Sequence, residues 1–97
     1  MIRSFGDAGT EDIYNGANTK AARRALPVDL QRVAQRKLDR INRAKELRDL
    51  RDPPANRLES LRGNWAGYYS LRINDQYRVV FQFAGGDALD VRIVDYH

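Results

Sequence analysis

The chain has 97 residues, of which 42% are apolar and 31% charged, with a formal net charge of +4 and no Cys. This length suits one hydrophobic core, so we expect a single domain over residues 1–97. No apolar run approaches the roughly 18 residues of a membrane span, and the N-terminus lacks the apolar stretch of a secretory signal, which predicts a cytoplasmic protein. Without Cys and with one His, disulfides, thiol chemistry and multi-histidine metal sites are excluded, and we expect no metal and no cofactor.

Arginine dominates the basic residues, with 14 Arg against 3 Lys. Residues 1–50 carry a net charge of +4, whereas residues 51–97 carry a net charge of zero. A basic first half is suited to contact with nucleic acid or with an acidic partner protein. A genome of high GC content would produce the same arginine bias without such a function.

The N-terminal segment predicts three short elements. Residues 2–5 are expected to form a short strand, which glycines interrupt. Residues 10–14 predict a short helix whose first three residues, starting at Thr10, supply its N-terminal cap. Residues 20–26 predict a second helix, which ends at Pro27.

The strongest helical pattern follows Asp29, whose carboxylate suits the positive N-terminal end of a helix dipole. Apolar residues then recur at spacings of three and four, as on one face of a helix: Leu30, Val33, Ala34, Leu38, Ile41, Ala44 and Leu47. Four arginines lie on the other side: Arg32, Arg36, Arg40 and Arg43. We interpret this arginine stripe as a solvated helix face, with contact to RNA or to a partner as the alternative.

The second half of the chain changes from a helical period to a period of two after Asp52-Pro53-Pro54. Strands are expected over residues 57–61, 67–73, 77–83 and 89–96, with turn residues between them. The sequence therefore predicts an α+β fold. Its N-terminal helices, over about residues 10–50, pack on one face of an antiparallel sheet over about residues 57–96.

Alternation along these strands predicts which side chains share a face of the sheet. The core-facing set is Tyr69, Leu71, Ile73, Tyr77, Val79, Phe81, Phe83, Leu89, Val91 and Ile93. The three-residue loop 74–76 places Arg72 directly opposite Arg78 on the other face, which Arg92 and Tyr96 share. Two facing cations weaken a sheet unless an anion lies between them, which favours a phosphate-binding face. Neutralisation by nearby carboxylates is the alternative.

The chain ends in Asp95, Tyr96 and His97. The imidazole of His97 titrates near neutral pH, so it can exchange a proton with a reacting phosphodiester. A final His is also typical of a disordered remnant or of a purification tag.

Four motifs occur in order along the chain: Asn56-Arg57-Leu58-Glu59, Leu61-Arg62-Gly63, the stretch from Tyr69 to Arg78, and Asp95-Tyr96-His97. Together they resemble the HigB-like, or plasmid-maintenance killer, branch of the RelE/ParE toxin superfamily. The resemblance implies a microbial-ribonuclease-like fold and a ribosome-dependent endoribonuclease that cuts mRNA in the ribosomal A site. It also implies a HigA-like helix-turn-helix antitoxin, through which the toxin reaches operator DNA indirectly.

Together with the face pattern, the resemblance assigns candidate roles to individual residues. The catalytic candidates are Glu59, Arg78, Asp95, Tyr96 and His97, and the RNA or phosphate contacts are Arg57, Arg62, Arg72 and Arg92. Arg78 occupies the position of an arginine that holds the scissile phosphate in the family. Glu59 stands where some relatives have His, so the assignment of base and acid between Glu59 and His97 is open.

Two other functions are compatible with the same superfamily: a ParE-like, non-enzymatic inhibitor of DNA gyrase, and a weakly toxic co-repressor that mainly binds antitoxin. A fold alone does not separate these functions, because function depends on the site. A binding-only toxin has no evident need for Glu59, Arg78, Tyr96 and His97 together. The sequence therefore favours a metal-independent ribonuclease.

Overall fold

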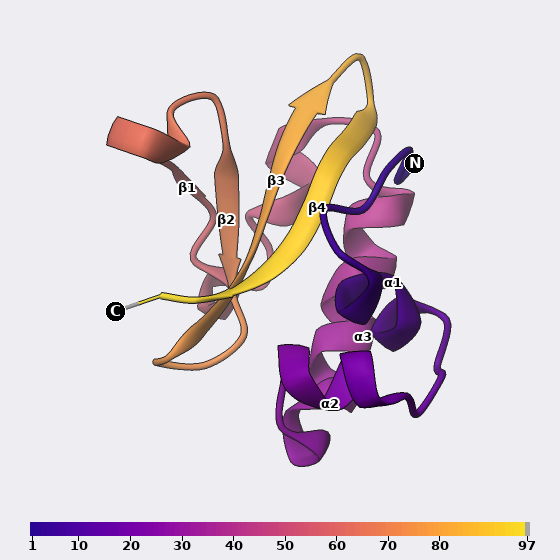
Figure 1. Cartoon of the computed structure of the whole chain (residues 1–97). Helices are drawn as coiled ribbons and strands as arrows, with labels where there is room; N and C mark the ends of the chain where they lie inside the picture. Colours follow the sequence, from indigo (N-terminus) through magenta and orange to yellow (C-terminus); the bar gives the residue numbers. More distant parts are fainter. Residues whose placement is uncertain (97) are drawn as a thin grey trace.

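The computed structural model describes residues 1–96, and within them three α-helices lie beside a four-stranded antiparallel sheet (Figure 1). The helices are α1 (Ala8–Tyr14), α2 (Lys20–Ala25) and α3 (Val28–Arg43). The strands are β1 (Glu59–Ser60), β2 (Tyr69–Arg72), β3 (Tyr77–Ala84) and β4 (Asp87–Asp95), in that order across the sheet. The α+β fold expected from the sequence is confirmed.

Helix α1 begins at Ala8, two residues earlier than the expected range of 10–14. Its N-terminal cap is Asp7, whose Oδ1 accepts a hydrogen bond from the backbone N–H of Thr10 at 2.7 Å. The prediction of a cap starting at Thr10 was therefore wrong. Thr10 is buried instead, and its hydroxyl oxygen accepts a hydrogen bond from the N–H of Ile93, which ties α1 to β4.

Helix α3 packs its buried residues, Ala34, Leu38 and Ile41, toward the sheet. Two residues depart from the predicted helical stripe, although Leu47 still packs against the core. Val33 is 37% exposed, and Leu47 lies in a separate 3-10 turn, Leu47–Leu50, because α3 ends at Arg43. The four arginines of the stripe are exposed, as the amphipathic pattern predicts.

The first strand is much shorter than the expected 57–61. A 3-10 turn, Pro54–Asn56, ends at Arg57, whose left-handed backbone (φ 47°) cannot continue into a strand. The N-terminal residues 2–5 likewise form two isolated parallel bridges to β4, Ile2 to Ala88 and Phe5 to Val91, rather than a strand. A further 3-10 turn, Gly63–Trp65, connects β1 to β2.

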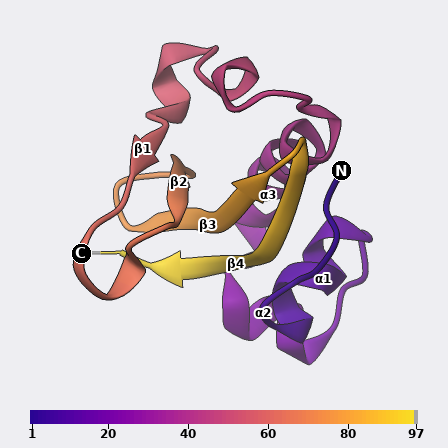
Figure 2. The ribbon, with the colours of Figure 1, turned by 90° about the horizontal axis from the view of Figure 1, so that it is seen from above.

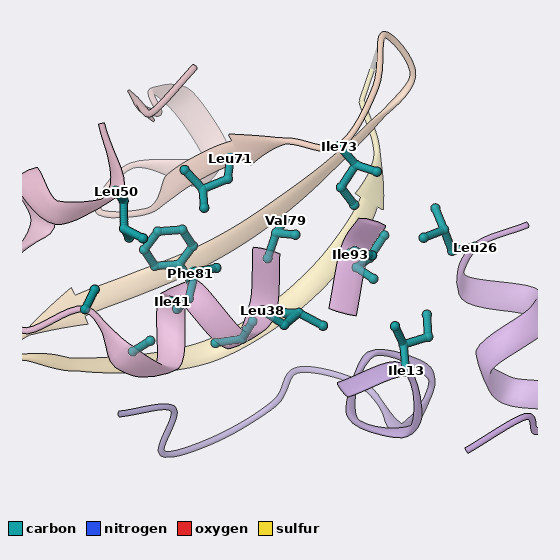
Figure 3. Close-up of a cluster of buried hydrophobic side chains, with 14 of the residues drawn as sticks. Ile13, Leu26, Leu38, Ile41, Leu50, Leu71, Ile73, Val79, Phe81 and Ile93 are labelled. Carbon is teal, nitrogen blue, oxygen red and sulfur yellow. The ribbon is translucent and has the colours of Figure 1, made fainter. Parts of the chain in front are cut away.

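The hydrophobic core lies between α3 and one face of the sheet. Leu38 and Ile41 approach Val79 and Phe81 of β3 (Figure 3). The predicted core-facing residues of β2 and β3 pack in this cluster or against it. Leu71, Val79 and Phe81 belong to this core cluster, whereas the equally buried Val80 does not, so the faces assigned to these strands are confirmed.

Strand β4 departs from simple alternation through a β-bulge. The register shifts between Val80 and Gln82, and Asp90 adopts a left-handed conformation with φ 52°. Ala88 is therefore buried in the core, whereas Leu89 pairs with Gln82 on the opposite face, so the core assignment of Leu89 was wrong. The bend of β4 along its length is visible from above (Figure 2). Among residues 1–96, no helix is long and apolar enough to cross a membrane.

Candidate active site

The candidate site lies where the C-terminal end of β2, the start of β3 and the end of β4 meet (Figure 1). Arg72 pairs directly with Arg78 across β2 and β3, as the three-residue loop predicts. Arg78 pairs in turn with Val94 of β4, so this face continues across three strands. The two arginines are thereby fixed by backbone pairing on one polar face.

The guanidinium group of Arg78 is the centre of this face, and its side chain is only 13% exposed. Its Nη1 lies 3.2 Å from Ser70 Oγ, to which it donates a hydrogen bond, and 3.5 Å from Glu59 Oε1. Its Cζ lies 5.1 Å from the ring centroid of Tyr96, within the range of a cation–π interaction. Two sequence-predicted residues, Glu59 and Tyr96, therefore both lie within reach of Arg78.

Local structure explains why these three groups meet. Glu59 pairs with Ser70 in β1 and β2, which sets its carboxylate beside the Arg78 side chain. The N–H of Tyr96 donates to the carbonyl oxygen of Gln76 at 2.6 Å, which holds the end of the chain against the β2–β3 turn. Ser70 is completely buried and was not among the predicted site residues, although it lies two residues before Arg72 and alternation puts both on one face.

Arg72 points to a different partner from Arg78. Its guanidinium is hydrogen-bonded to the carboxylate of Asp75, and this bond, with the charge of Arg72, holds the pKa of Asp75 below its ordinary value. The positive charge of Arg57 lowers the pKa of Asp75 further. This exposed carboxylate was missed by the sequence analysis, which considered neutralising acids only in general.

Lys37 of α3 brings another cation toward the same end of the sheet. Its Nζ donates a hydrogen bond to Asn56 Oδ1. Burial lowers the pKa of Lys37, and the positive charges of Arg40 and Arg72 lower it further. The positive charge near Arg72 therefore extends to Lys37 of α3. This proximity depends on how the helix packs on the sheet, so no local sequence pattern predicts it.

Arg92 lies in a second cluster on the same sheet face. Its Nη2 donates to Asp90 Oδ1 at 2.6 Å, and the Tyr68 hydroxyl donates to the other oxygen of Asp90. These two hydrogen bonds, Tyr68 first, lower the pKa of Asp90, and the bond to Asp90 raises the pKa of both Tyr68 and Arg92. Arg92 Cζ also lies 6.0 Å from the ring centroid of Trp65.

The remaining candidates lie apart from Arg78 or outside the described residues. Arg62 is exposed at the start of the turn Gly63–Trp65. Asp95 pairs across the sheet with Tyr77, a residue of the core-facing set. The Asp95 carboxylate accepts a hydrogen bond from Gln76 Nε2 at 3.0 Å. His97 lies outside the described residues. In residues 1–96, no group of three or more His, Cys, Asp or Glu side chains is arranged to hold a metal ion.

The arrangement has the chemistry of a phosphoryl-binding site. A nearly buried, permanently charged guanidinium can neutralise charge that develops on a phosphate, and a half-exposed carboxylate beside it can accept a proton. The Tyr96 ring, which lies under the same cation, carries a hydroxyl that can donate a hydrogen bond.

Comparison with known proteins shows the family of this chain. Residues 3–97 match the family model described as the RelE-like toxin of type II toxin-antitoxin system HigB. The chain is 38% identical over 90 residues to Toxin HigB-1 of Vibrio cholerae, a match that covers 93% of this chain and 92% of that protein. It is 32% identical over 98 residues to Endoribonuclease HigB of Proteus vulgaris, with complete coverage of both.

Solved structures with the same fold are more distant in sequence. The toxin–antitoxin complex YoeB-YefM of Staphylococcus aureus contains a chain with a TM-score of 0.61 and 18% identity, covering 100% of this chain and 98% of that one. YafQ of E. coli gives a TM-score of 0.58 at 14% identity, covering 98% of this chain and 91% of that one. At this identity the likeness establishes the fold.

Proposed function

Because the chain belongs to the HigB family of RelE-like toxins of type II toxin–antitoxin systems, we propose that it is a ribosome-dependent endoribonuclease that cuts mRNA. The observation that carries the proposal is the convergence of Glu59, Arg78 and Tyr96 on one face of the sheet. The Proteus vulgaris relative, 32% identical over its whole length, is named an endoribonuclease, which supports the same chemistry.

The proposed reaction uses the 2′-hydroxyl of the RNA as nucleophile. Glu59 or His97 takes the 2′-hydroxyl proton, and the 2′-oxygen bonds to phosphorus while the bond to the 5′-oxygen breaks. Arg78 neutralises the charge that builds on the phosphoryl oxygens, and His97 or Tyr96 gives a proton to the leaving 5′-oxygen. The products are a 2′,3′-cyclic phosphate, or the 3′-phosphate after hydrolysis, and a free 5′-hydroxyl. No step requires a metal ion.

Basic residues around Arg78 are proposed to hold the RNA backbone. Arg57 and Arg72 lie at the Asp75 end of the face, and Arg62 is exposed on the β1–β2 connection. The exposed arginine stripe of α3 is suited to sequence-independent phosphate contacts with ribosomal RNA. Asp95, beside Tyr96, is proposed to support the position of the chain end.

A type II toxin has a cognate antitoxin. We infer that this partner is a HigA-like protein with a helix-turn-helix domain, that the toxin meets operator DNA only through it, and that both proteins act in the bacterial cytoplasm. Residues 1–97 are proposed to form one toxin domain.

The test is to express the chain in cells without its antitoxin and to map RNA 5′ ends. We expect cleavage in phase with codons in translated messages, 5′-hydroxyl ends, and no cleavage with Arg78→Ala. Intact messages together with a loss of DNA supercoiling would contradict the proposal and indicate a gyrase inhibitor. Intact messages and normal growth would indicate an antitoxin-binding module instead.

A further inference from the structure

Trp65 is the single tryptophan of the chain, and it lies in the 3-10 turn that connects β1 to β2 at the edge of the sheet (Figure 1). Its neighbours Asn64 and Ala66 are exposed, but Trp65 itself is partly buried. The ring of Tyr68 meets it edge-on, with centroids 5.0 Å apart, and Arg92 lies over it at 6.0 Å. The indole is therefore held in a fixed orientation by two side chains.

The charge around Arg92 distinguishes this cluster from the Arg78 end of the face. Asp90 pairs with Arg92, and its lowered pKa keeps the carboxylate ionised at neutral pH, so the two charges cancel. The Nε of Arg92 is buried and has no hydrogen-bond partner among the described residues. A neutralised guanidinium with a carboxylate beside it attracts a phosphate weakly. The Arg92 side chain is still 35% exposed and Trp65 is partly exposed, so an uncharged aromatic ligand can reach both.

The position of this cluster relates it to the scissile phosphate. Arg92 pairs with Val80, two residues along β3 from Arg78, so the two arginines are diagonal neighbours on one face. Such neighbours are separated by about 7–8 Å, a length comparable with one nucleotide step of an extended RNA strand. Val80 is completely buried beneath them, which makes the floor between the two sites rigid.

We propose that Trp65 and Arg92 form a stacking site for the nucleobase of a nucleotide next to the phosphate that Arg78 holds. The proposal rests on the proposed ribonuclease function and adds where the substrate base is bound. It gives the two ends of the face different ligands: phosphate at Arg78 and a base at Trp65. Stacking tolerates any base, because every base has an aromatic face, so the site positions the RNA rather than reading its sequence.

The experiment measures cleavage of mRNA on purified, programmed ribosomes by the wild-type protein and by Trp65→Ala. The message is either intact or carries one abasic nucleotide on the 5′ or the 3′ side of the cleaved bond. On the intact message we expect Trp65→Ala to lower kcat/KM by about 5- to 150-fold, the range that base–aromatic stacking gives. On one of the two abasic messages this difference should disappear, because the base that the indole would contact is missing.

The abasic messages separate stacking from loss of structure. If Trp65→Ala only disorganised the β1–β2 connection, cleavage would fall by the same factor on all three messages, and that result would overturn the proposal. Equal activity of Trp65→Ala and wild type on the intact message would overturn it as well. Trp65→Phe keeps an aromatic face and should recover most of the activity. Failure of the wild type to cleave any message would instead refute the ribonuclease function itself, and the stacking site with it.

Discussion

Replacing Arg78 with alanine tests the proposed site most directly. The substitution removes a hydrogen bond to the buried Ser70, a 3.5 Å ion pair with Glu59 and a cation over the ring of Tyr96. Because Glu59 is 49% exposed, solvent screens the ion pair and it contributes little. The hydrogen bond and the cation–π contact each contribute roughly 0.5–1.5 kcal/mol, while removal of one facing cation relieves repulsion with Arg72.

We therefore expect Arg78→Ala to lower the free energy of unfolding by about 1–2 kcal/mol, which corresponds to a fall in Tm of roughly 5–15 °C for a chain of this size. The protein should remain folded at 25 °C. Its rate of RNA cleavage should fall by about 10²–10³-fold, the usual effect of removing one preorganised group that stabilises a transition-state anion. Because the variant stays folded, its loss of stability does not account for the much larger loss of cleavage rate.

Arg72→Ala is the matched control, since it removes the other member of the same facing pair. Arg72 contacts the exposed Asp75 rather than Glu59 and Ser70, so its loss should leave Tm nearly unchanged and should raise KM more than it lowers kcat. The assays are thermal unfolding followed by circular dichroism and cleavage kinetics on programmed ribosomes. Equal losses of kcat in the two variants, or full activity of Arg78→Ala, would refute the assignment of Arg78 as the transition-state cation.

Three further predictions concern Lys37 and the other catalytic candidates. Tyr96→Phe keeps the ring over the guanidinium but removes the hydroxyl, so Tm should be unchanged while kcat falls about tenfold or more in a cleavage assay; an unchanged kcat would exclude a proton-donating role. The pKa of Lys37 is lowered from 10.5 in the folded state, so the unfolded state binds more protons at a pH just below that value. The free energy of unfolding should therefore rise with pH in this range. Unfolding measured as a function of pH should no longer show this rise in Lys37→Met. The pH–rate profiles of Glu59→Gln and His97→Gln should show which residue is the base and which is the acid. The variant that lacks the base should lose the acidic limb, and the variant that lacks the acid should lose the alkaline limb. Unaltered profiles in both variants would exclude both residues from proton transfer.

The sheet face could be predicted where local rules decide it. A period of two and a loop of three residues fix the register of β2 and β3, and the structure pairs Arg72 with Arg78 as these rules require. The contact of Tyr96 with Arg78 follows from the same alternation carried through β4 beyond the bulge. These are short-range patterns, which depend little on the rest of the chain.

The face of Leu89 and the partner of Arg92 could not be predicted, because both depend on tertiary contacts. The bulge at Asp90 reverses the face of Leu89, and it is contacted by a residue remote in sequence: the N–H of Asp90 donates to the Ser4 hydroxyl oxygen at 2.8 Å. The contact of Asp90 with Tyr68 also joins β4 to the residue just before β2, and these two strands are not neighbours in the sheet. Neither contact leaves a periodic signal, so sequence reasoning placed Arg92 among phosphate ligands without detecting its carboxylate partner.

The N-terminal segment therefore has a specific role in shaping the Trp65 end of the site, and Gly6 offers a way to test it. A Cβ at Gly6 would lie 2.3 Å from Arg92 Nε and 2.7 Å from Asp90 Oδ1, so Gly6→Ala must displace the Arg92 side chain. Since the backbone of Gly6 needs no positive φ and its N–H to Val91 is retained, the net change in unfolding free energy should stay within about 1 kcal/mol. Cleavage should fall as far as in Arg92→Ala, and the double variant should be no worse than either single one, because all three remove the same contact with the indole ring. Additive losses in the double variant, measured as kcat/KM on programmed ribosomes, would show that Gly6 and Arg92 act separately.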